Sequence, residues 1–321
     1  MKEIFRPSFW LPEAHTQTIW ASKFRHLTCP DTKREQIELA DGDFINLFWL
    51  SEKKAPIVLI VHGLEGDLSS NNVKGMFIAI SKIGWNGVLL LNRNCGGITN
   101  RTQRTYHAGE TSDLDLIVNL IKNRSPKIPL MVFGYSLGGN ILLKWLGEKG
   151  ANAEINAAAA VSTPFDLGSS SATMEKGFSR IYQNHFINLL RSSAKRKFQN
   201  LPPLFNPGDI DKIGSLREFD EKITAPLHGF ENADHYYSES SCKKFLKNIQ
   251  VPTLIMNSMD DPFLDKETFP LQKDVSDFVE LEFHEKGGHA GFIFGNGLKK
   301  FSFIETRIPD FFKIHCQQGL P

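Results

Sequence analysis

The chain has 321 residues, of which 41% are hydrophobic and 23% are charged, a composition that is ordinary for a globular protein. Its formal net charge of +1 argues against a protein that binds nucleic acid or an anionic surface through its overall charge. The length is sufficient for one large α/β domain or two small ones.

The first twenty residues contain no long apolar core, because Arg6, Pro7, Pro12 and Glu13 interrupt it, so we expect no signal peptide there. No stretch of the chain approaches the roughly 18 apolar residues of a membrane helix, and we expect no integral membrane segment. The four cysteines are far apart and form no CxxC pair. This argues against a zinc site or a disulfide framework and fits a cytoplasmic location.

The first half of the chain is predicted to alternate between strands and helices. Residues 34–50 have the pattern of a β-hairpin around the turn Asp41-Gly42-Asp43. The predicted strands that follow are 56–62, 87–92, 129–133 and 155–161, and the predicted helices are 71–83, 137–147 and one that begins at Thr111 or Ser112. Such an alternation predicts an α/β fold with a mostly parallel sheet that is covered by helices on both faces.

The alternation stops between about residues 164 and 249, where no clear strand pattern occurs. A segment of this length is too long for a connecting loop. We predict that residues 164–249 form an inserted helical cap over the sheet. Residues 1–163 and 250–321 then form the core, with further strands at 251–256 and 279–283 and a final helix near 301–314.

The stretch FGYSLGGNILLKWLG, residues 133–147, contains a serine in the pattern Gly-x-Ser-x-Gly. A predicted strand precedes it and a predicted helix follows it, which is the context of a nucleophile elbow. In that sharp turn, glycines two residues to either side avoid steric conflict, and the hydroxyl is raised to the carboxyl end of the sheet. We therefore predict that Ser136 is a nucleophile rather than an incidental serine in a glycine-rich turn.

A serine nucleophile needs a base, and that base needs an acid to orient it. On this type of elbow the order along the chain is serine, acid, histidine. His289 lies in a loop with two preceding glycines after the last predicted strand, and we prefer it to His284, which ends that strand. We prefer Asp261, which follows the preceding strand, because the proline after it fixes the turn directly behind the acid. Asp260 remains the alternative acid.

Two backbone N–H groups are predicted to stabilise an oxyanion. The N–H of Leu137 lies directly after the serine, at a helix N-terminus. The second is expected in the loop after the first parallel strand, where Gly63 allows a close backbone approach and Leu64 follows. We interpret His62 in this loop as a structural residue rather than a second base.

These motifs resemble those of the α/β-hydrolase superfamily, specifically its YheT-like branch of esterases and lipid hydrolases. The resemblance extends over nearly the whole chain and depends on the order of the motifs. They are FRPSFWLPEAHTQTI, HGLEGDLSSN, NRNCGGITNRTQRTYHAGETSDL, FGYSLGGNILLKWLGEKG, VSTPFDL, GFSRIYQ, NSMDDPF and GGHAGF. The resemblance implies an α/β-hydrolase fold and a serine hydrolase with the triad Ser136, Asp261 and His289, and it implies no metal or organic cofactor.

Members of this branch are usually assigned to carboxylic esters, so the resemblance implies cleavage of such esters, acylglycerols and other lipid esters among them, through an acyl-enzyme. Three alternatives stay open: acyl transfer by the same triad, peptide or amide hydrolysis, and a catalytically silent binding protein. We expect a small-molecule or lipid ester as the partner and no nucleic acid. The sequence does not define the acyl-chain length, the leaving group or the oligomeric state.

The predicted cap contains candidates for substrate contact. Phe178, Ile181 and Phe186 are candidates for the wall of an acyl-chain site, and their spacing fits plain core packing equally well. The basic run at residues 191–197 either makes transient contact with a membrane or ends a solvated helix, and we favour the second interpretation.

The polar loop at residues 92–114 also has two interpretations. It contains Arg93, Arg101, Arg104, Tyr106 and His107. These side chains either bind an anionic group of the substrate or fix the loop through internal hydrogen bonds. We favour internal hydrogen bonds.

Overall fold

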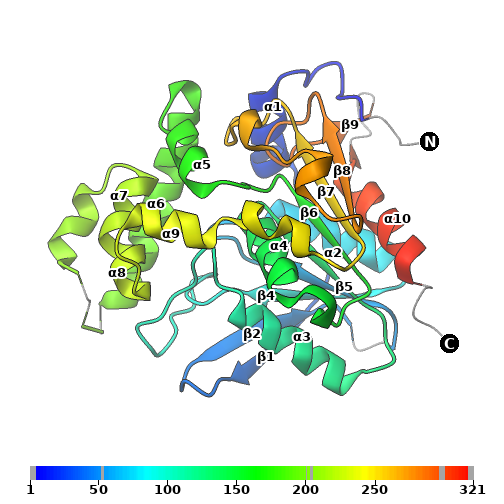
Figure 1. Ribbon diagram of the computed structural model, residues 1–321, viewed down its shortest axis with the longest axis horizontal. Helices are drawn as coiled ribbons and strands as arrows, with labels where there is room; N and C mark the ends of the chain where they lie inside the picture. The colour runs from blue at the N-terminus through cyan, green and yellow to red at the C-terminus, as the bar shows by residue number, and fades with distance from the viewer. Residues whose placement is uncertain (1–4, 52–53, 200, 203–204, 296–300, 317–321) are drawn as a thin grey trace.

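The computed structural model describes residues 5–51, 54–199, 201–202, 205–295 and 301–316. An eight-stranded sheet with the order β1-β2-β4-β3-β5-β6-β7-β8 forms its centre (Figure 1). The strands are β1 (Lys33–Glu38), β2 (Phe44–Trp49), β3 (Ile57–Val61), β4 (Asn86–Leu91), β5 (Leu130–Tyr135), β6 (Ala157–Val161), β7 (Thr253–Ser258) and β8 (Val279–His284). β1 and β2 form the predicted hairpin, β2 is antiparallel to β4, and the remaining pairs are parallel.

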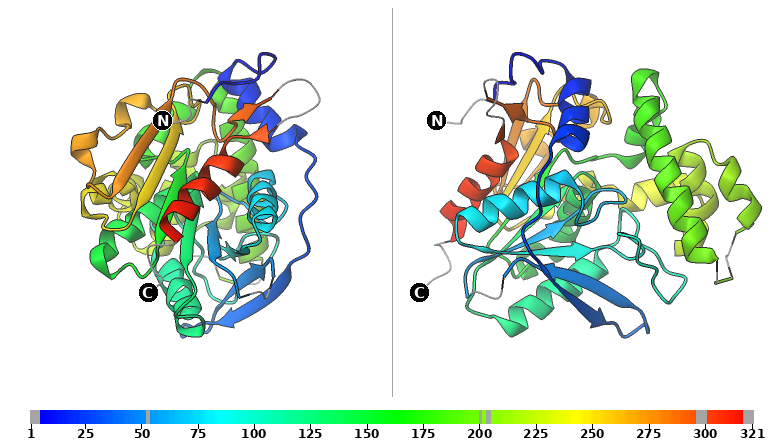
Figure 2. Two further views of the ribbon diagram at one scale, coloured as in Figure 1. Left: turned by 90° about the vertical axis from the view of Figure 1, so that its right-hand side faces the viewer. Right: turned by 180° about the vertical axis from the view of Figure 1, so that it is seen from behind.

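Helices cover both faces of the sheet, as Figure 2 shows from two further sides. On one face lie α2 (Asn71–Lys82) and α10 (Ile304–Cys316), and on the other lie α3 (Ser112–Arg124) and α4 (Leu137–Lys149). Successive side chains of β3 alternate between the two hydrophobic cores, with Leu59 on the α3–α4 side and Ile60 on the α2–α10 side. Burial on both faces explains the continuous apolar run of this strand. The predicted mostly parallel sheet with flanking helices is confirmed.

Four elements near the chain ends differ from the sequence prediction. α1 (Ala14–Ile19) continues into a π-helical turn at Trp20–Phe24, where we predicted no helix. β9 (Ile293–Phe294) and β10 (Phe301–Ser302) form a small antiparallel pair. Because residues 301 and 302 pair with β9, the final helix begins at Ile304 rather than near residue 301.

Helices occupy the segment between β6 and β7, and no strand occurs among its described residues. The α-helices are α5 (Leu167–Met174), α6 (Arg180–Phe198), α7 (Leu216–Phe219), α8 (Ala225–His228) and α9 (Ala233–Ser240), joined by shorter 3-10 and π-helical turns. α6, α7 and α8 gather to one side of the sheet (Figure 1). Ile187, Ile213 and Ile223 belong to a hydrophobic cluster that these helices share. The division into a core at 1–163 and 250–321 and a cap at 164–249 remains a prediction.

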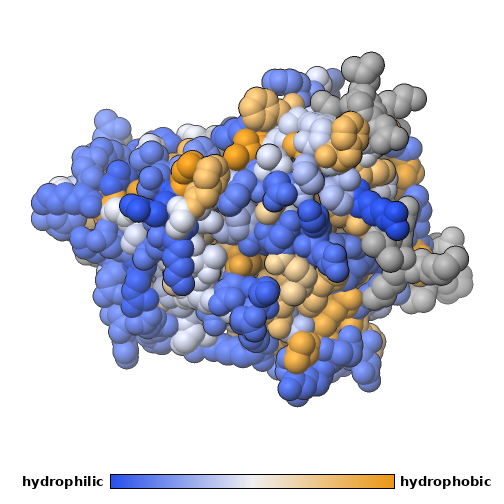
Figure 3. All heavy atoms as spheres, turned by 90° about the horizontal axis from the view of Figure 1, so that it is seen from above, coloured by the Kyte–Doolittle hydropathy of each residue, from blue (hydrophilic) through white to orange (hydrophobic). Residues whose placement is uncertain are grey.

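The face of the molecule seen from above is mainly hydrophilic, and its hydrophobic residues form several separate groups (Figure 3). Among the helices that the structure describes, none has both the length and the apolar character needed to cross a lipid bilayer.

The polar loop after β4 is fixed by internal ion pairs. Arg93 is 3% exposed, and its guanidinium makes two hydrogen bonds to the carboxylate of Asp113, at 2.7 and 2.8 Å. It also contacts Asp41 at 2.7 Å and the fully buried Asp43 at 3.3 Å. Arg101 pairs with Glu38 and Arg104 with Glu110. For the three arginines, internal pairing is therefore the interpretation that the structure supports.

Replacing Arg93 with methionine is expected to reduce the free energy of unfolding by about 3–5 kcal/mol, because Asp43 and Asp113 would remain buried without their cation. Urea denaturation measures this loss. The control is Arg217→Met, which breaks a pair with Asp234 whose side chains are 48% and 73% exposed. That change should cost about 1 kcal/mol or less. Equal losses in the two variants would contradict a structural role for the buried pairs.

Candidate active site

Ser136 lies in the turn between β5 and α4, and its backbone is left-handed, with a φ of 52°. This conformation is strained for a residue with a side chain. A Cβ atom at Gly134 would lie 2.5 Å from the carbonyl oxygen of Gly138, and one at Gly138 would lie 2.1 Å from that of Val61. Only glycine therefore fits at these two positions, and the turn has the shape of the elbow predicted from GYSLG.

Three side chains that the sequence analysis selected form one hydrogen-bonded row. Oγ of Ser136 lies 2.9 Å from Nε2 of His289, and Nδ1 of His289 lies 2.8 Å from Oδ2 of Asp261. His289 and Asp261 are each 6% exposed. When Nδ1 donates its proton to the carboxylate, Nε2 is left as an acceptor for the serine proton. The row thus has the geometry for removing a proton from Ser136.

The alternative residues lie elsewhere. One carboxylate oxygen of Asp260 accepts the backbone N–H of Gly288 at 2.9 Å, so this side chain holds the loop rather than the imidazole. Burial raises the pKa of Asp260. His284 contacts Glu282 at 3.0 Å, and that carboxylate also accepts a hydrogen bond from Arg307.

The N-terminal segment positions the loop that carries His289, a role that the sequence analysis did not assign. The backbone N–H of His289 donates to Oγ1 of Thr18 at 2.9 Å. Gln17, which is fully buried, accepts the N–H of Ile293 at 2.7 Å and donates to its carbonyl oxygen at 3.1 Å. A Cβ atom at Gly288 would lie 2.3 Å from the carbonyl oxygen of Ala14. α1 therefore packs directly against the histidine loop.

The ring of Phe263 was also missed. It stacks on the imidazole of His289, with ring centroids 4.0 Å apart and an angle of 19° between the planes. The backbone N–H of Phe263 donates to Oδ1 of Asp261 at 2.9 Å. The sequence Asp261-Pro-Phe thus supplies both the acid and an aromatic support for the base.

The two predicted oxyanion donors lie beside the nucleophile, Leu64 in the loop after β3 and Leu137 at the first position of α4. A Cβ atom at Gly63 would lie 3.3 Å from Cβ of Ser136, which places the loop after β3 in contact with the elbow. Leu64 and Leu137 line the same pocket as Ser136. His62 donates from Nδ1 to the carbonyl oxygen of Gly63 at 2.7 Å, and its Nε2 accepts the N–H of Asn92 at 3.0 Å. Because burial lowers the pKa of His62 to about 4, the ring is neutral and structural.

Ser136 and His289 open into a pocket with a volume of about 1130 Å³, including the space at its opening. Most of the wall is apolar. Its larger aliphatic residues and phenylalanines are Leu64, Leu137, Leu167, Met174, Phe186, Leu190, Phe198, Leu216, Phe219, Ile223, Leu227, Phe263 and Leu264. The apolar character of this wall suits a ligand with a hydrocarbon chain.

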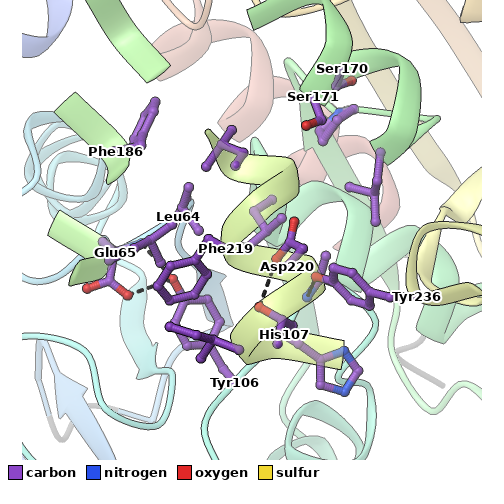
Figure 4. A pocket seen from close by; sticks show the side chains of 18 of the residues that line it. Leu64, Glu65, Tyr106, His107, Ser170, Ser171, Phe186, Phe219, Asp220 and Tyr236 are labelled. Atoms are coloured by element: carbon purple, nitrogen blue, oxygen red, sulfur yellow. Dashed lines mark hydrogen bonds between the residues drawn. The ribbon is translucent and has the colours of Figure 1, made fainter. Parts of the chain in front are cut away.

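Of the three residues predicted for substrate contact, the structure brings only Phe186 to this pocket (Figure 4). Phe178 and Ile181 are 48% and 56% exposed and do not line it, so the prediction for these two is corrected. Phe178 instead packs against the ring of His15, with centroids 4.4 Å apart. Phe178 precedes α6, which begins at Arg180, and Ile181 lies outside the row from Phe186 to Phe198 that lines the pocket in steps of four residues.

Residues 56–296 match the family described as alpha/beta hydrolase fold. The chain belongs to this family. It is 38% identical over 98% of its length, and 94% of the relative's, to an Escherichia coli (strain K12) protein described as "Putative esterase YheT". It is 27% identical to "Phospholipase ABHD3" of Bos taurus over 99% of this chain and 80% of that protein. The solved structure of a Pyrococcus furiosus esterase aligns with a TM-score of 0.54 at 18% identity, covering 89% of this chain and 93% of that one.

The match confirms the fold class and the YheT-like resemblance that the motifs indicated. In this α/β hydrolase the polar loop after β4 also contributes to the pocket, through Tyr106 and His107. The hydroxyl of Tyr106 accepts the N–H of Glu65 at 2.8 Å and donates to its Oε1 at 3.1 Å. Figure 4 shows Glu65 and Tyr106 together among the lining side chains. Burial raises the pKa of Glu65 to about 7.

Replacing Glu65 with glutamine is expected to flatten the pH dependence of the hydrolase's stability. The folded state retains the Glu65 proton up to about pH 7, whereas the unfolded state loses it near its ordinary pKa of 4.5. Between these values the folded state binds more protons, so the wild-type free energy of unfolding falls as pH rises. The urea midpoints of wild type and variant, measured from pH 4 to pH 8, should therefore diverge. Relative to wild type, the variant should be more stable above pH 7 than at pH 4. Parallel curves would show that Glu65 is not protonated in the folded state.

Proposed function

We propose that this α/β hydrolase cleaves carboxylic esters through a covalent acyl-enzyme, with Ser136 as nucleophile, His289 as base and Asp261 as the orienting acid. The observation that carries the proposal is the hydrogen-bonded row of these side chains at the mouth of a mainly apolar pocket. The esterase and phospholipase descriptions of the relatives support the same reaction class.

In the proposed first half-reaction, Nε2 of His289 takes the proton of Ser136 as Oγ attacks the ester carbonyl carbon. The carbonyl oxygen becomes an oxyanion, and the N–H groups of Leu64 and Leu137 donate hydrogen bonds to it. The intermediate collapses, the bond to the leaving alcohol breaks, and His289 delivers its proton to that alcohol. Asp261 stabilises the imidazolium while it exists.

In the second half-reaction, His289 takes a proton from water, and the resulting nucleophile attacks the acyl carbon. The bond to Oγ of Ser136 then breaks, and the proton returns to the serine, so acid is released and the enzyme is regenerated. We propose that the helices of residues 164–249 act as a cap over this site. The side chains of Phe186 and Leu190 give the acyl chain an apolar wall.

The test is hydrolysis of p-nitrophenyl esters from acetyl to palmitoyl, together with labelling by a fluorophosphonate that modifies activated serines. We expect turnover with a chain-length optimum set by the pocket, and label on the peptide that contains Ser136. Addition of glycerol or ethanol distinguishes hydrolysis from acyl transfer, because only an acyltransferase forms a new ester as its main product. Folded protein that neither turns over any ester nor takes up label would overturn the proposal.

A further inference from the structure

One part of the pocket wall is polar and belongs to the predicted cap. We call this set of side chains the cap niche; it consists of Ser170, Ser171, Asp220, Thr224 and Tyr237, which all line the pocket. The carboxylate of Asp220 accepts hydrogen bonds from Thr224 Oγ1 at 2.7 Å and from Tyr237 OH at 2.8 Å. Burial raises the pKa of Asp220 to about 6. Each carboxylate oxygen retains a further lone pair for a ligand donor.

Ser170 gives the cap niche an unused hydroxyl. The residue is 9% exposed, and its Oγ has no hydrogen-bond partner within the part of the chain that the structure describes. Figure 4 shows Ser170 and Ser171 side by side on α5. A buried hydroxyl without a partner is unfavourable, so a ligand group that completes its hydrogen bonding is favoured there. The cap niche therefore offers ligand hydroxyl groups an acceptor in Asp220 and a donor in Ser170.

The charges around the pocket restrict the ligand further. Among the described residues that line it, none is lysine or arginine, and the two acidic residues are Glu65 and Asp220. Burial lowers the pKa of His107 to about 4, so this lining histidine is neutral at pH 7. Arg196 does not line the pocket, and its guanidinium donates to the carbonyl oxygen of Asn94 at 3.2 Å. A phosphate group would therefore meet carboxylates instead of the arginine or lysine that normally binds it.

We propose that the cap niche binds a hydroxyl group of the leaving alcohol, and that the pocket selects neutral polyol esters over esters that carry a phosphate. This inference rests on the proposed ester hydrolysis. We assign the niche to the alcohol because the large apolar side chains elsewhere in the wall, such as Phe186, Leu190 and Phe198, suit the acyl chain. A neutral hydroxyl-bearing alcohol pairs with both an acceptor and a donor in the niche, whereas a simple alkyl group leaves both unpaired.

The test compares three esters of one fatty acid, namely its glycerol monoester, its propyl ester and its glycerol phosphate monoester. We expect wild-type kcat/KM to be at least tenfold higher for the glycerol ester than for either of the others. Ser170→Ala should lower the glycerol-to-propyl ratio about three- to tenfold, since it removes one hydrogen bond. Asp220→Asn should raise the phosphate-to-glycerol ratio by about tenfold, since it removes a negative charge.

The matched control is Ser169→Ala, on the same helix. Ser169 does not line the pocket, and its Oγ donates to Asp265 at 3.3 Å, so the substrate ratios should stay at their wild-type values. Binding of the intact glycerol and propyl esters to Ser136→Ala, measured by calorimetry, repeats the comparison without turnover and with the niche unaltered. Tighter binding of the glycerol ester is expected.

The outcomes separate this inference from the proposed function. Cleavage of all three esters at similar rates, or wild-type ratios in both niche variants, would overturn the hydroxyl subsite and leave ester hydrolysis intact. Preference for the phosphate ester would overturn the charge argument. Folded wild-type protein that cleaves none of the three esters nor any p-nitrophenyl ester would overturn both proposals.

Discussion

Replacing Ser136 with alanine is expected to lower kcat/KM for the best p-nitrophenyl ester by about 10⁴-fold or more, because the acyl-enzyme can no longer form. Oγ is the only atom removed, and it is the atom that lies 2.9 Å from His289 Nε2. Alanine meets the same left-handed backbone strain as serine, so the urea midpoint should change little. The measurement is a steady-state assay on both proteins, with covalent labelling at the elbow as a second readout.

The control for this experiment is Ser238→Ala, an exposed serine of α9 whose Oγ donates to the carbonyl oxygen of His235. It should keep full activity. Labelling first shows that the purified Ser136→Ala protein contains no wild-type enzyme. If this protein still retained more than about one hundredth of the wild-type rate, the nucleophile would be another residue. Equal rates in wild type and Ser136→Ala would contradict the proposed ester hydrolysis, since the fold alone does not establish an activity.

The sheet and the elbow were predictable because their signals are local. The apolar run of β3 and the glycine spacing of GYSLG are properties of a few adjacent residues. Burial on both faces of the sheet explains the first, and steric crowding in the turn explains the second. Asp261 and His289 could also be predicted, since the order of elements determines which loops meet Ser136. The structure brings these three side chains together as expected.

The contacts that were missed depend on residues far apart in the sequence. Thr18 meets the His289 backbone across 271 positions, and no periodicity within either segment indicates that contact. Phe178 and Ile181 illustrate a different limit. Apolar residues on and before a helix can be recognised from the sequence, but the face that turns to a pocket is set by packing against other elements. In α6 that face begins at Phe186.

Replacing Asp261 with asparagine is expected to lower kcat by about 10⁴-fold, whereas Asp260→Asn should cost about tenfold or less. Asp261 accepts the Nδ1 proton of His289 at 2.8 Å, and an amide that donates in its place would favour the wrong tautomer of the imidazole. Asp260 accepts the backbone N–H of Gly288, which an amide oxygen also does. Its replacement therefore preserves the loop contact.

The two aspartates form a matched pair, since they are adjacent, acidic and bonded to the same histidine loop. A structural role for both would reduce activity in proportion to lost stability, so urea midpoints and kcat should be measured on each variant. We expect the large loss of kcat in Asp261→Asn to occur with little change in KM, because the imidazolium forms only during reaction. Similar losses in the two variants, or a larger loss in Asp260→Asn, would contradict the assignment of Asp261 as the orienting acid.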